Sequence, residues 1–258
     1  MASSSSKNIK IELRGVVKGF GKKEILTGAD LKVERGITQV ILGKSGTGKS
    51  VLLKCVLGLE PIQGGEIFVD GNPISNLRGA DRMAMMSKFG MLFQGAALFD
   101  SLNIWENVAF VPLQHGMKRS LAKELALEKL RMVGLKPEVA EQNPSALSGG
   151  MRKRAGLARA ICTDPEIIFY DEPTTGLDPI TADVINDLII KLQNELKCTS
   201  IVITHDMTSA FKVADRMAFL YDGKFINEGT AEEFRTTKDP MLRQFVDGRA
   251  DGPIQIAY

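Results

Sequence analysis

Hydrophobic residues along the chain follow two spacings, and each spacing predicts one kind of element. Apolar and polar residues alternate at 9–13, which is the pattern of a half-buried strand. Unbroken apolar runs predict strands buried on both faces, as in parallel sheets. These runs lie at 167–170 and 200–204, and residues 38–42 form a short β-rich run that ends at Gly43. Apolar residues recur at helical spacing at 50–59 and at 184–196, so strands and helices alternate and predict an α/β fold.

The segment from about 98 to 160 has a different pattern and predicts a helical subdomain inserted in the α/β core. Residues 120–133 form an amphipathic pattern, with Leu121, Leu125 and Leu130 near one face, and 149–160 also predict a helix. Shorter strands are expected elsewhere along the chain. They lie at 66–69, 90–93 and 216–221.

The two ends of the chain differ from the rest. Residues 1–7 are Ser-rich and predict a disordered tail, residues 8–246 predict one domain, and 247–258 predict an extended C-terminal tail.

No apolar run reaches the roughly 18 residues that a membrane-spanning helix needs. A net charge of +2 argues against a nucleic-acid partner, and three cysteines without metal-ligand spacing predict reduced, mostly buried thiols.

A glycine-rich loop between a predicted strand and a predicted helix carries the first chemical signal. The octet that starts at Gly43 and ends at Ser50 fits the pattern G-x-x-x-x-G-K-[ST], which binds phosphate through backbone N–H groups. Lys49 is expected to reach the β- and γ-phosphates, and the Ser50 hydroxyl to ligate Mg²⁺. The residues expected to hold the nucleotide here are Gly43, Lys44, Ser45, Gly46, Thr47, Gly48, Lys49, Ser50 and Val51.

Two carboxylates follow the predicted strand at 167–170. Asp171 and Glu172 alone would predict only an acidic strand end before a turn. After a phosphate loop, they predict a Mg²⁺ site and a water site, with Asp171 holding the ion through its water shell and Glu172 polarising the attacking water.

The segment Leu147–Met151 precedes a predicted helix. The Ser148 hydroxyl, the N–H groups of Gly149 and Gly150, and the helix dipole suit a γ-phosphate, and Ser148 can equally cap the helix. The basic residues 152–154 that follow are expected to form a solvated face rather than a nucleic-acid site, and Arg152 or Lys153 could add positive potential near the phosphate.

At these residues the chain resembles the ABC ATPases. Phe93-Gln94 resembles their Q-loop, Gly176-Leu177-Asp178-Pro179 their D-loop and Thr204-His205-Asp206 their H-loop, in the family's order over about 8 to 235. The resemblance implies a P-loop ABC ATPase with a RecA-like α/β core, an N-terminal antiparallel β part and a helical subdomain. It also implies ATP and Mg²⁺ as cofactors.

The resemblance also implies roles for single residues. Gln94 would contact Mg²⁺ or the lytic water, His205 the γ-phosphate, and Asp178 would connect two sites across a dimer of two copies. Ser148, Gly149 and Gly150 would close over the ATP of the second copy. Phe20 matches the aromatic that stacks on adenine, although it could simply cover the sheet edge. Val51 stands where many relatives have Ser or Thr, so only its backbone can serve the α-phosphate.

Three further segments resemble the ATPase subunits of Mla phospholipid transporters and of related MCE systems. These are Met151, residues 95–102 and residues 243–253. That branch implies a membrane permease, an MCE-type lipid-binding protein and a peripheral place on the cytoplasmic face of a bacterial inner membrane. It leaves open a small cytosolic subunit. Pro173–Leu177 has the general ABC form, so two alternatives to this branch stay open. They are another ABC importer or exporter, and a soluble ABC ATPase that does not act in transport.

An apolar stretch near Gln94 is the candidate contact with the permease. Leu98, Phe99, Leu102 and Trp105 could form a groove for its coupling helix. The alternative is that these side chains fill the core of the helical insertion.

Overall fold

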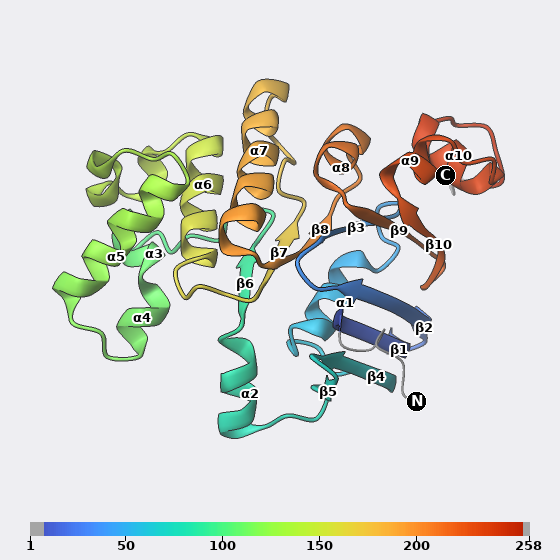
Figure 1. The fold of residues 1–258 in the computed structure, drawn as a ribbon, viewed down its shortest axis with the longest axis horizontal. Coiled ribbons are helices and arrows are strands. Elements are labelled where there is room, and N and C mark those ends of the chain that lie inside the picture. The colour runs from blue at the N-terminus through green and yellow to red at the C-terminus, as the bar shows by residue number, and fades with distance from the viewer. Residues whose placement is uncertain (1–7, 255–258) are drawn as a thin grey trace. The chain divides into compact units, whose positions relative to one another are not determined.

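The computed structural model describes residues 8–254, and the chain divides into two compact units (Figure 1). The first unit combines the segment up to Leu77 with the segment from Val202 onward, and the second runs from Arg78 to Ile201. The division falls inside strand β8 (Thr199–Ile203). The tail expected at 1–7 and the residues after 254 lie outside the described part of the chain.

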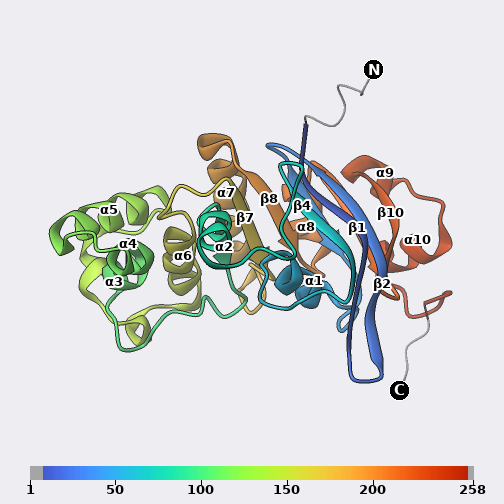
Figure 2. The same ribbon diagram turned by 90° about the horizontal axis from the view of Figure 1, so that it is seen from below.

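The first unit contains an antiparallel sheet with strand order β2-β1-β4-β5, whose long strands lie side by side in Figure 2. The strands are β1 (Ile9–Phe20), β2 (Lys23–Glu34), β4 (Gly64–Val69) and β5 (Asn72–Pro73). Ile11, Leu13 and Val16 of β1 are buried, in keeping with the predicted half-buried strand. The N-terminal antiparallel part is therefore confirmed.

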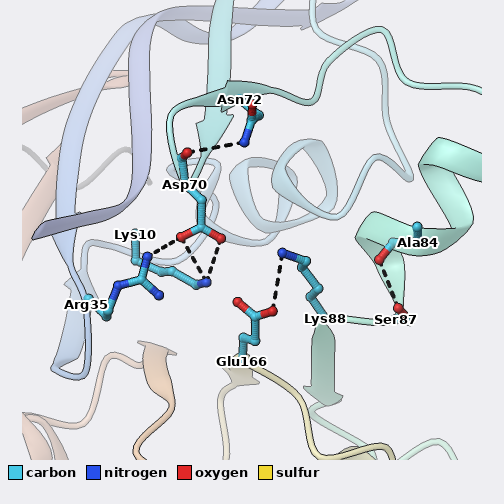
Figure 3. A network of polar contacts seen from close by, with 8 residues as sticks. All are labelled: Lys10, Arg35, Asp70, Asn72, Ala84, Ser87, Lys88 and Glu166. Carbon is cyan, nitrogen blue, oxygen red and sulfur yellow. Dashed lines mark hydrogen bonds and ion pairs between the residues drawn. The ribbon is translucent and has the colours of Figure 1, made fainter. Parts of the chain in front are cut away.

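The turn after β4 is held by a charged network, shown in Figure 3. Asp70 has a left-handed backbone (φ 51°) and accepts hydrogen bonds from Lys10 at 3.0 and 2.8 Å, and one from Arg35. Lys10 is only 1% exposed, so its charge depends on this carboxylate. Burial alone would raise the pKa of Asp70, but the bonds from Lys10 and Arg35 outweigh it and hold the pKa below the ordinary value.

The first unit also holds parallel strands that lead into the candidate site. All five residues of β3 are buried, β3 pairs in parallel with β9, and β10 pairs antiparallel with β9. Thr204 N donates to Ile41 O at 3.4 Å, so the end of β8 lies beside β3. The elements are β3 (Thr38–Leu42), α1 (Lys49–Val56), α8 (Met207–Val213), β9 (Arg216–Tyr221), β10 (Lys224–Thr230), α9 (Ala231–Arg235) and α10 (Pro240–Asp247).

The segment after α10 folds back onto that helix. Gly248 ends α10 in a left-handed conformation (φ 64°), as C-terminal caps often do. The Gln244 side chain is buried, accepts from Ile254 N at 2.7 Å and donates to Ile254 O at 3.1 Å. It also donates to the backbone oxygens of Arg249 and Ala250. The expectation of an extended tail is therefore wrong for 249–254, because one amide supplies the donor and the acceptor that fix this loop.

The second unit contains the first part of β8, followed by β7 and β6 in that strand order, with β6 and β7 parallel, and a group of helices. Its elements are α2 (Gly79–Met86), β6 (Phe89–Leu92), α3 (Ile104–Val108), α4 (Phe110–Gln114), α5 (Arg119–Met132), two 3₁₀ turns (Pro137–Glu141 and Pro144–Ala146), α6 (Gly149–Ala160), β7 (Ile167–Asp171) and α7 (Pro179–Leu196). Helices α3 to α6 lie together in both views, as the helical pattern at 98–160 predicts (Figures 1 and 2).

The packed face of α5 differs from the predicted one. Ala122, Ala126 and Leu130 are fully buried at i, i+4 and i+8, whereas Leu121 is largely exposed. Small residues let α5 approach its neighbours closely, which leucine spacing alone does not reveal.

The three cysteines are all buried, as expected. Burial raises the pKa of Cys55 to about 11 and that of Cys162 to about 12, so both thiols stay protonated at neutral pH. Within residues 8–254, no helix has the length and apolarity needed to cross a bilayer.

Candidate active site

The glycine-rich loop of the first unit joins β3 to α1, as predicted. Gly46 and Gly48 have positive φ values of 81° and 99°, a region that glycine enters without steric cost. A Cβ atom on Gly43 would lie 2.6 Å from Leu220 O and 2.8 Å from Thr47 Oγ1. The backbone can therefore take this path only with glycine at 43.

Lys49 closes the loop from within. Its side chain is 7% exposed, and Nζ donates to Gly43 O at 2.6 Å and to Lys44 O at 3.0 Å. The Thr47 hydroxyl also donates to Lys44 O, at 2.9 Å. The ammonium and the N-terminus of α1 thus place positive charge at one loop, which suits a phosphate group. Ser50 is exposed in the first turn of α1.

Two more predicted residues belong to the first unit. Phe20 stands at the end of β1, is 47% exposed, and has Lys18 Nζ 4.6 Å from its ring centroid. Nearly half of the side chain is therefore accessible, as stacking on a base would require. His205 is exposed after β8, between Thr204, whose hydroxyl accepts from Asp206 N at 3.0 Å, and Asp206, which caps α8.

The carboxylates Asp171 and Glu172 lie in the second unit at the end of β7. The four residues before Asp171 are buried, so the strand is a rigid support. Glu172 has a left-handed backbone (φ 49°), which a non-glycine residue adopts only where its surroundings hold it there. Thr175 supplies two of the holding bonds: its hydroxyl donates to Glu172 Oε2 at 3.1 Å and its N–H to Glu172 O at 3.3 Å.

Lys153 brings Gln94 and Glu172 together inside the second unit. Its Nζ donates to the backbone oxygen of Gln94 and, at 3.1 Å, to that of Glu172. The side chain is only 5% exposed, so the expectation that residues 152–154 form a solvated face is wrong for Lys153. Burial lowers the pKa of Lys153, and the nearby carboxylates Glu172 and Asp171 oppose that shift.

Sequence reasoning considered Lys153 only for positive potential near the phosphate and missed its contacts with Gln94 and Glu172, although a signal was present. On α6 the buried face is made largely of small residues, among them Gly150, Gly156 and Ala160, and Lys153 lies in the middle of it. A lysine on such a face must find acceptors inside the protein.

The segment at the start of α6 has a structural role that was also predicted. Ser148 is the N-cap, and its hydroxyl accepts from Met151 N at 3.3 Å. A Cβ on Gly149 would lie 3.5 Å from Leu177, and one on Gly150 would collide with the Thr181 side chain. Glycine at 150 therefore lets α6 pack against the start of α7, whereas position 149 has room for a Cβ atom.

Asp178 is the N-cap of α7. It accepts from Thr181 Oγ1 at 2.6 Å, Thr181 N at 3.0 Å and Ile180 N at 3.1 Å. These bonds, above all those from Thr181, lower the pKa of Asp178. The side chain is exposed, and so is Ile180 beside it.

The apolar stretch after Gln94 separates into exposed and buried members. Phe99 is exposed and its ring lies 4.6 Å from that of Phe110, while Trp105 is buried under the guanidinium of Arg119 at 4.9 Å. Leu98 and Leu102 are half-buried. Trp105 therefore fills the helical core, and Phe99 remains the exposed apolar candidate.

Comparison with known proteins agrees with this arrangement of loops. Residues 26–175 match the family described as "ABC transporter". The chain is 39% identical over 247 residues to the "Probable ribonucleotide transport ATP-binding protein mkl" of Mycobacterium leprae, covering 95% of this chain and 71% of that protein. It is 40% identical over 249 residues to the "Intermembrane phospholipid transport system ATP-binding protein MlaF" of Haemophilus influenzae, covering 96% of this chain and 94% of that protein.

A solved structure supports the same assignment. The dimeric post-hydrolysis state of the ATP-binding cassette MJ0796, bound to ADP and Pi, aligns with a TM-score of 0.78 and 32% identity, covering 86% of this chain and 98% of that chain. The fold is thus a P-loop ABC ATPase with a RecA-like α/β core, an N-terminal antiparallel β part and a helical subdomain. This chain belongs to the ABC transporter family and is the ATP-binding, ATP-hydrolysing subunit of such a transporter.

Proposed function

We propose that two copies of this chain bind ATP in composite sites and drive a membrane permease that moves phospholipid. The observation that carries the lipid assignment is the match with MlaF, named for intermembrane phospholipid transport, over 96% of this chain and 94% of that protein. Nearly end-to-end similarity includes the parts of the chain that lie outside the general family match at 26–175.

The phosphate loop would hold the β- and γ-phosphates of ATP. The residues fit this group, because Gly43 leaves no room for a side chain and Lys49 brings its ammonium onto the loop. Phe20 would stack on adenine through its exposed ring. Val51 would contribute only its backbone.

A magnesium ion would be held by few protein groups. Ser50, Asp171 and Gln94 are the proposed ligands, direct or through water. Among residues 8–254 there is no cluster of three or more His, Cys, Asp or Glu side chains suited to a metal. That fits Mg²⁺, which keeps several waters and takes much of its coordination from phosphate oxygens. When bound, it would neutralise charge that develops on those oxygens.

Glu172 would take the proton from the attacking water. Its left-handed backbone and its bond from Thr175 fix the carboxylate at the end of a buried strand. His205 would donate to the γ-phosphate, and Gln94 would orient the water and report nucleotide state to the permease. The exposed Phe99 would receive the permease's coupling helix.

The second copy would complete each site. Ser148, Gly149 and Gly150 lie at the N-terminus of a twelve-residue helix, whose dipole favours the γ-phosphate held by the other copy. Asp178 would connect the two sites. The solved relative with this fold is dimeric and contains ADP and Pi, which supports this assembly.

The names of the relatives suggest two substrate classes for the transporter. The mkl name gives ribonucleotide transport, and the MlaF name gives phospholipid transport. We favour phospholipid because MlaF is matched along 94% of its own length, against 71% for mkl. The expected partners are a permease, an MCE-type lipid-binding protein and, as an open case, a small cytosolic subunit. The expected location is the cytoplasmic face of a bacterial inner membrane.

Purification from native membranes tests this assignment. The complex would be extracted in detergent, its subunits identified by mass spectrometry and its bound small molecules analysed as lipids and as nucleotides. The proposal expects a multi-span permease, an MCE-type subunit and phospholipid. A ribonucleotide, amino-acid or metal permease without an MCE-type subunit would overturn the lipid assignment and leave the ATPase assignment intact.

A further inference from the structure

The buried face of α6 contacts both functional loops of the second unit through one ammonium group. Lys153 Nζ donates to Gln94 O and to Glu172 O, residues that stand 59 and 19 positions away in the sequence. An ammonium has three N–H donors and no acceptor, so it is suited to bridging carbonyl oxygens. Because the group is buried and charged, these bonds are stronger than bonds between neutral groups.

The Glu172 backbone needs such a bond. Its φ of 49° is strained for a residue with a side chain, and such strain persists only where several contacts determine it. The Glu172 carbonyl accepts from Lys153 at 3.1 Å and from Thr175 N at 3.3 Å. Lys153 therefore supplies the shorter of the two bonds to that carbonyl.

The loop after Gln94 is strained as well, and α6 holds it. Ala96 and Ala97 have φ values of 60° and 49°. Arg159, six residues after Lys153, donates to Ala96 O at 2.7 Å and to Ala97 O at 2.6 Å. Between these cations, a Cβ on Gly156 would lie 3.2 Å from the Ala96 Cβ. Helix α6 therefore bonds this segment through Lys153 and Arg159, and at Gly156 it approaches the segment closely.

We propose that Lys153 is a positioning residue for ATP hydrolysis: it fixes Glu172 and Gln94 relative to α6, with Arg159 as the second anchor of the Gln94 loop. The helix that begins at Ser148 would then carry both loops with it as one rigid piece. This inference rests on the hydrolytic roles proposed above for Glu172 and Gln94. Lys153 donates to the backbone oxygens of these two residues, so it acts through them.

The first experiment compares Lys153→Met, Lys153→Arg and Lys153→Gln with the matched control Arg154→Met. Arg154 follows on the same helix, and its guanidinium donates to Gly134 O. Lys153→Met is expected to lower kcat about 10- to 100-fold, the cost of misplacing a catalytic group by roughly 1 Å. ATP affinity should stay within about twofold, because the phosphate loop is untouched. Lys153→Arg should restore most of kcat, and Arg154→Met should match the wild type.

The second experiment repeats Lys153→Met in a background that carries both Glu172→Gln and Gln94→Ala, under single-turnover conditions. Because Lys153 acts through these two residues, its loss should cost no more than about threefold there, since the effects of interacting residues are not additive. An equal factor in both backgrounds, or unchanged kcat for Lys153→Met, would overturn the inference. If Lys153→Met does not fold, as judged by thermal melting, the folded Lys153→Gln variant takes its place, with a smaller loss of kcat expected.

The two proposals can fail separately. Wild-type hydrolysis by Glu172→Gln would remove the role proposed for that carboxylate. A defective Glu172→Gln beside fully active Lys153→Met and Lys153→Gln would remove only the role of Lys153.

Discussion

The phosphate loop and the pair formed by Gln94 and Glu172 are held in different ways. Lys49 secures the loop by bonding to Gly43 and Lys44, six and five positions away in the chain. Gln94 and Glu172 are held by Lys153, at sequence distances of 59 and 19. The side-chain bonds of the loop are therefore local, although Gly43 also packs against Leu220, whereas the hydrolytic pair is held by a bond from a distant helix. Substitutions in the two regions should accordingly separate nucleotide binding from turnover.

The largest expected effect is on turnover. Glu172→Gln should lower kcat by about 10²- to 10⁴-fold, the usual contribution of a general base, while ATP still binds. The variant should collect as an ATP-bound dimer. Single-turnover hydrolysis and light scattering with and without ATP measure both properties. A wild-type rate in this variant would contradict the role given to Glu172.

The next effect is on binding. Lys49→Ala removes the ammonium that closes the loop. We expect ATP affinity to fall at least about 100-fold, because the variant loses the charged hydrogen bonds from Lys49 to the phosphates. Equilibrium titration with a fluorescent ATP analogue measures it. Lys54→Ala, an exposed position on the same helix, is the control and should bind as the wild type does. Equal affinity in the two variants would show that the loop does not depend on Lys49.

A third substitution should lower the stability of the fold without changing ATP binding or ATP hydrolysis. Asp70→Asn removes the carboxylate that Lys10 and Arg35 share, and the free energy of unfolding should fall by about 1–3 kcal/mol because the buried Lys10 loses its charge partner. Exposed Glu24→Gln is the control. Urea unfolding measures the loss, and ATP affinity of the folded variant should not change.

The pH dependence of that stability has a definite sign. The pKa of Asp70 is lowered in the folded protein, so the protein gains stability from this group at pH values above the ordinary carboxyl pKa of about 3.9. That gain is lost as pH falls below this value through the lowered pKa. The difference between wild type and Asp70→Asn should therefore shrink in acid, and a difference that grows would contradict the assignment.

The smallest effect separates two roles of Asp178. Asp178→Ala removes the N-cap of α7, which should slightly lower the free energy of unfolding. Asp178→Ser keeps a capping oxygen and should recover that stability. If Asp178 also connects the two copies, ATP hydrolysis should stay impaired in Asp178→Ser. Full recovery of hydrolysis would leave capping as its sole role.

Local patterns were sufficient to predict much of this molecule. The strand before Gly43, the helix after it and the cap at Ser148 all depend on neighbours within a few residues, so periodicity and loop composition predict them. The bonds from Lys153 to Gln94 and Glu172 were missed because these acceptors lie far away in the sequence. The fold of 249–254 was missed because it depends on one side chain, Gln244. Which of Phe99 and Trp105 is buried likewise depends on packing that no local pattern encodes.

A mixing experiment tests most directly whether the active sites are shared between two copies. Lys49→Ala copies retain Ser148, and Ser148→Arg copies retain the phosphate loop, so a mixed dimer would hold one complete site. We predict that each variant alone has no measurable ATP hydrolysis and that the mixture of folded variants recovers it. A mixture as inactive as its components, or wild-type hydrolysis by Ser148→Arg alone, would contradict the composite site.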